Sequence, residues 1–230
     1  MTTPAKLLVV TADDFGISRG VNRGIVQAHR EGILTSTSLM VQRPAAVEAA
    51  ALARECPALS VGLHLELDSG ASDLPTALDR QLDRFTELVG APPTHLDSHH
   101  DVHRDPRVQP YVRAWARRLG VPLRGYSLVR HLPKFYGQWG GETHLEQISV
   151  EGLLRLLDAE LGHGVTELTC HAGYVDAGLA SSYTVEREAE VRTLCDPRVR
   201  PALAERGIRL AGFRDLTALV AAPPVAEGAT

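Results

Sequence analysis

The sequence predicts an α/β fold, an irregular (β/α) barrel of about seven parallel strands. Short apolar runs alternate with longer amphipathic segments, which is the pattern of strands that feed crossover helices. About seven such units follow one another without a linker-like change of composition, so residues 1–230 are expected to form a single domain. Seven repeats favour a barrel over a short open sheet, and a doubly wound sheet remains the alternative.

The N-terminal half alternates regularly between the two kinds of element. In the first amphipathic segment Val21, Ile25 and Ala28 share one helix face, and Gly32 supplies a stop signal. Pro44 stands at the start of the second helix, where proline is tolerated. The expected order is strand 6–12, helix 18–32, strand 35–41, helix 44–56, strand 59–67, helix 77–90, strand 93–100, helix 106–120 and strand 121–127.

The C-terminal half begins with a segment that lacks clear periodicity. Residues 128–147 are rich in aromatic residues and glycine, and we expect a loop or lid there. The regular pattern then returns, and the last residues, 222–230, are expected to be a frayed tail. The expected elements are helix 149–164, strand 165–173, helix 184–195, strand 207–213 and helix 214–222.

Composition and charge argue against several classes of protein. A formal net charge of −4, with arginines spread along the chain, offers no basic surface for nucleic acid. No segment approaches the roughly 20 consecutive apolar residues of a membrane span, and the N-terminus reaches charged residues too early for a signal peptide. Three widely spaced cysteines suit neither a disulfide framework nor a zinc knuckle. We therefore expect a cytoplasmic protein without nucleic-acid or membrane partners.

Polar side chains stand at the ends of four predicted strands. Asp13 and Asp14 follow the first strand, and His64, His99 and His171 occupy similar places on later strands. The carboxyl ends of parallel strands lie at one face of a barrel, so these residues are expected to meet there. Carboxylates and imidazoles are ligands for divalent ions, and two imidazoles with one carboxylate leave positions open for water. A catalytic site for one divalent metal ion, Mg²⁺ or Zn²⁺, is the prediction.

The adjacent carboxylates of Asp13 and Asp14 would repel each other without a cation. A bound ion accounts for the pair if one carboxylate is a ligand and the other accepts a proton from water. Adjacent residues of an ideal strand point to opposite faces, so both can enter the site only if the chain turns at Asp14. Gly16 permits such a turn.

The cluster DSHHDVH contains more histidines than one ion needs. In an extended strand His99 and His103 lie too far apart to share an ion, whereas in a helix they can share it. We favour His99 as the ligand because it stands at a strand end, as His64 does. His103 is then expected to support the ligands or to contact the substrate.

The chain resembles the YdjC-like carbohydrate deacetylases, the family that includes chitooligosaccharide deacetylases. The matching stretches include TADDFGIS, GVNRGIVQAHREGILTSTSLMV, VGLHLEL, PPTHLDSHHDVHRDP, VPLR and ELTCHAGYVD, in the family's order and over most of the chain. The resemblance implies an irregular barrel related to the polysaccharide deacetylases, with a divalent metal ion, that removes the N-acetyl group from an acetylated amino sugar or oligosaccharide.

The resemblance also implies a role for each polar residue at the strand ends. It makes Asp14, His64 and His99 the metal ligands and Asp13 the general base. His171 takes the place of the family histidine that is expected to act as general acid, which would protonate the leaving amine.

Two further residues are candidates for contact with the substrate or with the catalytic groups. Arg124 stands at a predicted strand end and could orient Asp13 or bind a sugar hydroxyl, with a surface salt bridge as the alternative. Tyr174 could stack on a sugar ring. The acetylated sugar is the expected partner, and a homodimer is left open.

The chain departs from the family pattern in three places. Asp101 stands where the family usually has histidine, Ala172 stands where it usually has proline, and the segment after Leu67 is short. The short segment predicts a more open pocket and leaves the substrate undetermined. Two alternatives therefore stay open: a metal-dependent hydrolase of another amide or ester, and a catalytically inactive sugar-binding homologue.

Overall fold

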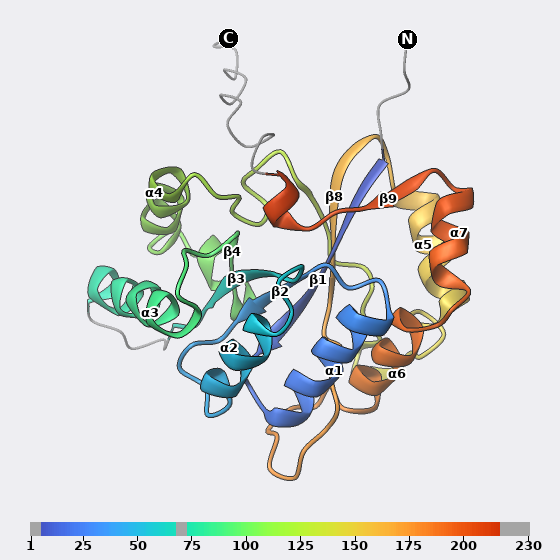
Figure 1. Cartoon of the computed structure of the whole chain (residues 1–230), viewed down its shortest axis with the longest axis horizontal. Helices are drawn as coiled ribbons and strands as arrows, with labels where there is room; N and C mark the ends of the chain where they lie inside the picture. The colour runs from blue at the N-terminus through green and yellow to red at the C-terminus, as the bar shows by residue number, and fades with distance from the viewer. Residues whose placement is uncertain (1–5, 68–72, 217–230) are drawn as a thin grey trace.

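A single curled sheet of seven parallel strands forms the centre of the molecule (Figure 1). The computed structural model describes residues 6–67 and 73–216. The strand order is β4-β3-β2-β1-β8-β5, and β9 pairs with the start of β1. The expected class, a (β/α) barrel of about seven parallel strands, is confirmed. Within the described residues β4 and β5 end the path without pairing with each other, so the barrel is open on that side.

Strand β1 lies at the middle of the sheet. It pairs with β8 from Lys6 to Ala12 and with β2 from Thr11 onward, so both of its edges are occupied. The strands of the main sheet are β1 (Lys6–Phe15), β2 (Ser36–Leu39), β3 (Ser60–Leu65), β4 (Leu96–Ser98), β5 (Arg130–Leu132), β8 (Gly164–Cys170) and β9 (Ile208–Leu210), and a separate hairpin is formed by β6 (Gln138–Trp139) and β7 (Glu142–Thr143).

Helices surround the sheet on its outer side (Figure 1). Their ends follow local signals: the Ser18 hydroxyl accepts a hydrogen bond from Val21 at the first helix, and Gly90 and Gly120 end later helices in the left-handed conformation. The helices are α1 (Arg19–Glu31), α2 (Ala46–Arg54), α3 (Leu74–Val89), α4 (Gln109–Leu119), α5 (Val150–Glu160), α6 (Val185–Leu194) and α7 (Val199–Glu205), with short 3₁₀ helices η1 (His99–Arg104) and η2 (Phe213–Leu216).

The two faces of β1 have different surroundings. Leu8, Val10 and Ala12 belong to the main core that the helices cover, whereas Val9 packs with Phe213 in a second cluster. Side chains alternate along a strand, so the face that carries Val9 continues toward Asp13. The carboxyl end of β1 therefore presents a carboxylate on the face opposite the helix-covered core.

Several expected elements differ in the structure. The predicted strand 121–127 makes only an isolated bridge, Leu123 to Leu96, because Pro122 has no N–H group and Gly125 turns the chain at φ 74°. The predicted strand 93–100 is shortened to β4, since the chain turns after Ser98. Residues 128–147, expected as a loop or lid, contain β5 and the β6–β7 hairpin. These strands have two or three residues each, too few for a periodic pattern.

Helix α7 was not predicted from the sequence, and the predicted helix 214–222 begins as η2. The remainder of that helix and the tail 222–230 lie outside the described residues, as does part of the short segment after Leu67. Among residues 6–67 and 73–216, no helix combines the length and the apolar character that crossing a membrane requires.

Candidate metal centre

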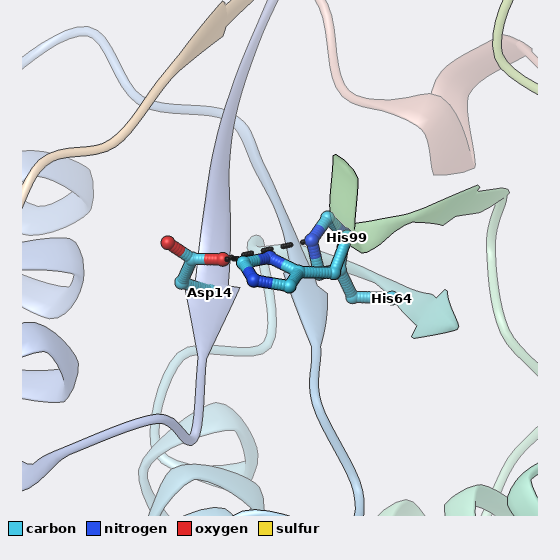
Figure 2. A group of neighbouring side chains, drawn as sticks. All are labelled: Asp14, His64 and His99. Carbon is cyan, nitrogen blue, oxygen red and sulfur yellow. Dashed lines mark ion pairs between the residues drawn. The ribbon is translucent and has the colours of Figure 1, made fainter. Parts of the chain in front are cut away.

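Three side chains from three elements converge at the carboxyl end of the sheet (Figure 2). Asp14 comes from β1, His64 from β3, and His99 from the turn after β4. The Asp14 Oδ1 atom lies 3.6 Å from Nε2 of His64 and 3.3 Å from Nδ1 of His99. One donor atom of each residue lies within 4.8 Å of the others. The three residues predicted as ligands are thus brought together.

A local turn directs Asp14 into this group. Asp14 has φ 69°, in the left-handed region, and the pairing of β1 with β2 shifts register between Ala12 and Phe15. Gly16 follows at φ 95°, and its N–H group donates to the Asn22 side chain at 2.8 Å. Because of this bulge, adjacent carboxylates do not point to opposite faces, and both reach the same end of the barrel.

His64 is held in one orientation by a buried carboxylate. Its Nδ1 atom lies 2.8 Å from Oδ1 of Asp97, the residue opposite it on β4, which leaves Nε2 facing Asp14. Burial alone lowers the pKa of His64, but the carboxylates of Asp97, Asp13 and Asp14 outweigh it and raise the pKa to about 9.

His99 reaches the group because the chain leaves β4 by a sharp turn. His100 and Asp101 have φ angles of 53° and 55°, which ends the extended conformation directly after His99. The His99 side chain is 28% exposed, against 1% for His64. Solvent therefore has access to the three predicted ligands from the side on which His99 lies. Asp101 pairs with Arg104 at 3.4 Å, so the carboxylate that replaces the family histidine is engaged outside the group.

Asp14 has one oxygen engaged and one free. Oδ2 accepts a hydrogen bond from Arg187 at 2.6 Å, whereas the buried Oδ1 atom accepts none within the described residues. Burial raises the pKa of Asp14, but His99, His171, Arg187 and His64 together lower it well below its usual value. A buried, ionised oxygen without a donor, facing two imidazoles, fits a bound cation.

Asp13 forms a two-pronged ion pair with Arg124. Both of its oxygens lie 2.8 Å from guanidinium nitrogens, and the Ser38 hydroxyl donates to Oδ1 at 3.2 Å. Burial raises the pKa of Asp13, but Arg124 outweighs this effect and the pKa lies below its usual value. Arg124 is 5% exposed, so the alternative of a surface salt bridge is wrong.

Arg124 also binds two further carboxylates. Its guanidinium lies 2.6 Å from Asp97 and 2.9 Å from Glu167. The His103 ring supports this arrangement, because Nε2 meets the Arg124 carbonyl at 3.1 Å while Nδ1 meets the Ser98 hydroxyl at 2.6 Å. Both ring nitrogens of the fully buried His103 are thus engaged by protein atoms, which favours a supporting role over contact with substrate.

His171 follows β8 at the position next to Asp13 on β1, since Ala12 pairs with Cys170. Its backbone N–H group donates to Glu190, and its Nδ1 atom is buried without a partner among the described residues. Burial lowers the pKa of His171, and Asp14 and Asp13 only partly oppose this effect. The rings of Tyr136 and Tyr183 meet it edge-on, with centroids 5.7 Å and 5.5 Å away.

Tyr174 is engaged with helix α1. Its hydroxyl donates to Gln27 at 2.5 Å, and its backbone N–H group donates to the Gly20 carbonyl at 3.0 Å. These contacts join the loop after β8 to α1, and stacking of Tyr174 on a sugar stays a prediction. Ala172, the second departure from the family pattern, is fully buried.

The residues that orient the predicted site residues were not predicted from the sequence. Asp97 stands inside a strand, where an unexplained buried carboxylate was a usable signal. Glu167 is a similar case on β8. Arg187 and Glu190 lie among other charged residues of α6, so no pattern in the sequence separates them from surface positions.

Two proteins named chitooligosaccharide deacetylase are similar to this chain over nearly its whole length. The protein from Serratia marcescens is 35% identical, and the alignment covers 92% of this chain and 99% of that protein. The protein from Enterobacter sp. (strain 638) is 36% identical with the same coverage.

Solved structures share the fold. A protein from Enterococcus faecalis V583, whose proposed role is cellobiose-phosphate cleavage, matches with a TM-score of 0.79 at 29% identity, covering 92% of this chain and 99% of the other. A peptidoglycan N-acetylglucosamine deacetylase matches with a TM-score of 0.56 at 12% identity, covering 90% and 86%, which shows likeness of fold alone. The family described as YdjC-like protein matches residues 7–80 and 71–205. With this match and relatives above 30% identity, the chain belongs to the YdjC-like family.

Proposed function

We propose that this protein is a metal-dependent carbohydrate deacetylase, which hydrolyses the N-acetyl group of an acetylated amino sugar or oligosaccharide. The observation that carries the proposal is the unpartnered Asp14 oxygen that faces His64 and His99 at the open end of the barrel. The names of relatives that are 35% and 36% identical over 92% of the chain support the choice of substrate class.

Asp14, His64 and His99 are the residues that would hold one divalent ion. The other two groups of potential ligands, Asp13–His64–Asp97 and His95–Asp97–Glu167, contain carboxylates already paired with the Arg124 cation. Carboxylate and imidazole ligands accept Zn²⁺ and Mg²⁺, and two imidazoles favour Zn²⁺. When bound, the ion polarises the acetyl carbonyl and lowers the pKa of water.

Asp13 is the general base of the proposed reaction. Arg124 keeps its carboxylate ionised and fixed in position, so it is ready to accept a proton from the attacking water. Arg124 thus acts by orienting Asp13, and its guanidinium is committed to three carboxylates rather than to a sugar hydroxyl.

His171 is the general acid, which donates a proton to the leaving nitrogen so that an amine rather than an amide anion departs. Because burial lowers its pKa, the ring is neutral in the free protein at pH 7. It must therefore take up a proton from solvent before it can protonate the leaving nitrogen, while Asp13 holds the proton taken from the attacking water. The products are acetate and a free amino sugar.

Metal content and acetate release test the proposal. We expect Asp14→Ala and His64→Ala to lose the bound ion and the activity on N-acetylglucosamine oligomers, while the matched exposed variant Asp79→Ala keeps both. Asp13→Asn should keep the ion and lose turnover. Undiminished metal in both ligand variants would exclude this site, and an unchanged rate in Asp13→Asn would exclude the base. A panel of acetylated lipids and small amides separates the sugar deacetylase from another amide or ester hydrolase.

Cellular location and assembly complete the proposal. Cys56, Cys170 and Cys195 are all free thiols, which supports a reducing compartment such as the cytoplasm. A homodimer stays a prediction, and the mass of the protein in solution tests it.

A further inference from the structure

Helix α6 holds the backbone of His171 from both sides. The His171 carbonyl accepts a hydrogen bond from Nη1 of Arg187 at 3.2 Å, and the His171 N–H group donates to Glu190. Arg187 and Glu190 are three residues apart on α6, so they lie on the same face of that helix. Both residues are buried. The two peptide groups that flank the side chain of His171 are therefore fixed by one helix.

The imidazole ring of His171 has no comparable anchor. Within residues 6–67 and 73–216 its buried Nδ1 atom has no hydrogen-bond partner, whereas a carboxylate fixes the ring of His64. The ring meets Tyr183 edge-on, and α6 holds Tyr183 as well. The Tyr183 carbonyl accepts from Nε of Arg187 at 3.1 Å, and its hydroxyl donates to Glu190 at 2.5 Å. The place of the His171 ring thus depends on backbone contacts and packing that the same two residues of α6 provide.

The guanidinium of Arg187 also contacts the predicted metal ligand Asp14. Its Nη2 atom donates to Oδ2 of Asp14 at 2.6 Å, while Nη1 donates to the His171 carbonyl. A guanidinium is planar and rigid, so the separation between its two ends is constant. A single buried group therefore links the position of His171 to the position of Asp14.

We infer that Arg187 and Glu190 are positioning residues, which hold His171 where it can protonate the leaving nitrogen. This inference rests on the proposed function and adds to it two residues that act through His171 rather than on the substrate. Position matters because proton transfer requires a donor and an acceptor about 2.6–3.2 Å apart. A displacement of about 1 Å can lower a rate about 100-fold.

Two kinds of leaving group distinguish a displaced acid from general damage to the site. The nitrogen of an N-acetyl sugar must be protonated before it departs, whereas the phenolate of 4-nitrophenyl acetate departs without a proton. The attack of water on the acetyl carbonyl is common to both substrates. Displacement of His171 should therefore slow the amide reaction alone, while damage to the metal ligands or to Asp13 should slow both reactions.

Variants of α6 test the inference with these two substrates at saturating zinc. Arg187→Lys keeps the charge but loses the fork that bridges two partners, and Glu190→Met removes the acceptor for the His171 N–H group. Each should lower kcat on N-acetylglucosamine oligomers about 10–100-fold, with KM within about twofold, and change the rate on 4-nitrophenyl acetate less than about threefold. His171→Gln should show the same pattern, because it removes the acid itself.

Two milder variants serve as the conservative replacement and the control. Glu190→Gln keeps an oxygen that can accept from the His171 N–H group, so it should retain most of the activity on the sugar. Arg192→Met changes an exposed arginine of the same helix and should match the wild type on both substrates. Asp14→Ala should abolish hydrolysis of the ester as well, which shows that both substrates use the same site.

A measurement on metal-free protein separates this inference from the proposed function. Nuclear Overhauser contacts between the ring of His171 and the rings of Tyr136 and Tyr183, whose centroids lie 5.7 Å and 5.5 Å away, report the place of the acid. Arg187→Lys and Glu190→Met should weaken these contacts, and the control should keep them. This outcome supports the inference even if the wild type deacetylates no sugar, a result that would count against the proposed function alone. Unchanged contacts in both variants, or equal rate losses on the sugar and the ester, overturn the inference.

Discussion

Replacement of Arg124 with methionine tests whether the interior of the barrel is organised around one cation. The guanidinium lies within hydrogen-bond distance of Asp13, Asp97 and Glu167, and every member of this cluster is less than 10% exposed along its side chain. Methionine has a similar length and removes the charge. Three buried carboxylates then lose their common partner.

The expected cost is large because each carboxylate is buried. Removing one partner of a buried ion pair typically costs about 3–5 kcal/mol, since the remaining charge stays desolvated. For a chain of this size, about 2–4 °C of melting temperature corresponds to 1 kcal/mol, so a decrease of roughly 6–20 °C is expected at pH 7. Thermal unfolding followed by circular dichroism, in a chelator that removes divalent ions, measures it.

The structure also gives the sign of the pH dependence of the stability difference between the wild type and Arg124→Met. In the wild type the pKa values of Asp13 and Asp97 are lowered, so their contribution to stability is present above the unfolded pKa of about 3.9 and is lost as pH falls through the folded pKa. Without Arg124, burial raises these pKa values. As the carboxylates then become protonated, the variant loses its unpaired buried charges and regains stability. The difference between wild type and variant should therefore narrow as pH falls from 7 toward 4.

Arg84→Met, on the exposed side of α3, serves as the control and should have the same melting temperature as the wild type. A decrease in melting temperature of less than about 2 °C for Arg124→Met would refute the idea that Arg124 organises the buried carboxylates. A stability difference that widens as the pH falls would refute it as well.

Three further outcomes follow from the same electrostatics. Because the pKa of His64 is raised to about 9 and an ion must displace its proton, zinc affinity should fall about tenfold for each pH unit below 9, which calorimetry in two buffers measures together with proton release. Asp97→Asn should weaken zinc binding about 10–100-fold, since Asp97 orients His64, while the exposed variant Asp79→Asn should leave the affinity unchanged. Burial raises the pKa of Glu190 to about 8, so its contribution to stability is full below the unfolded pKa of about 4.3 and is lost as pH rises through 8. Urea titrations between pH 5 and 8 should show a decline in the free energy of unfolding of the wild type and a weaker decline in Glu190→Gln. The same pH dependence in both proteins would contradict this role of Glu190.

The order of strands and helices was predictable because each depends on a local repeat. Helix α1 illustrates this: its apolar face, the serine before it and Gly32 after it all lie within 15 residues of sequence. Elements of two or three residues, such as β5, carry no such repeat, and α7 was missed for a related reason, since one turn or two of helix shows little periodicity.

The meeting of Asp14, His64 and His99 was also predictable, because the carboxyl ends of parallel strands lie at one face of the barrel. What the sequence by itself determined is therefore the set of strand-end residues and the face where they gather.

Only the tertiary structure decided which partner orients each of them. Asp97 is 33 residues from His64, Arg124 is 111 from Asp13, and Arg187 is 173 from Asp14. Such pairs depend on the order of strands in the sheet and on the exclusion of water from its interior, and neither leaves a local pattern in the chain. Burial converted Arg124 from one arginine among many into the shared partner of three carboxylates, because a charge removed from water must find its counter-charges within the fold.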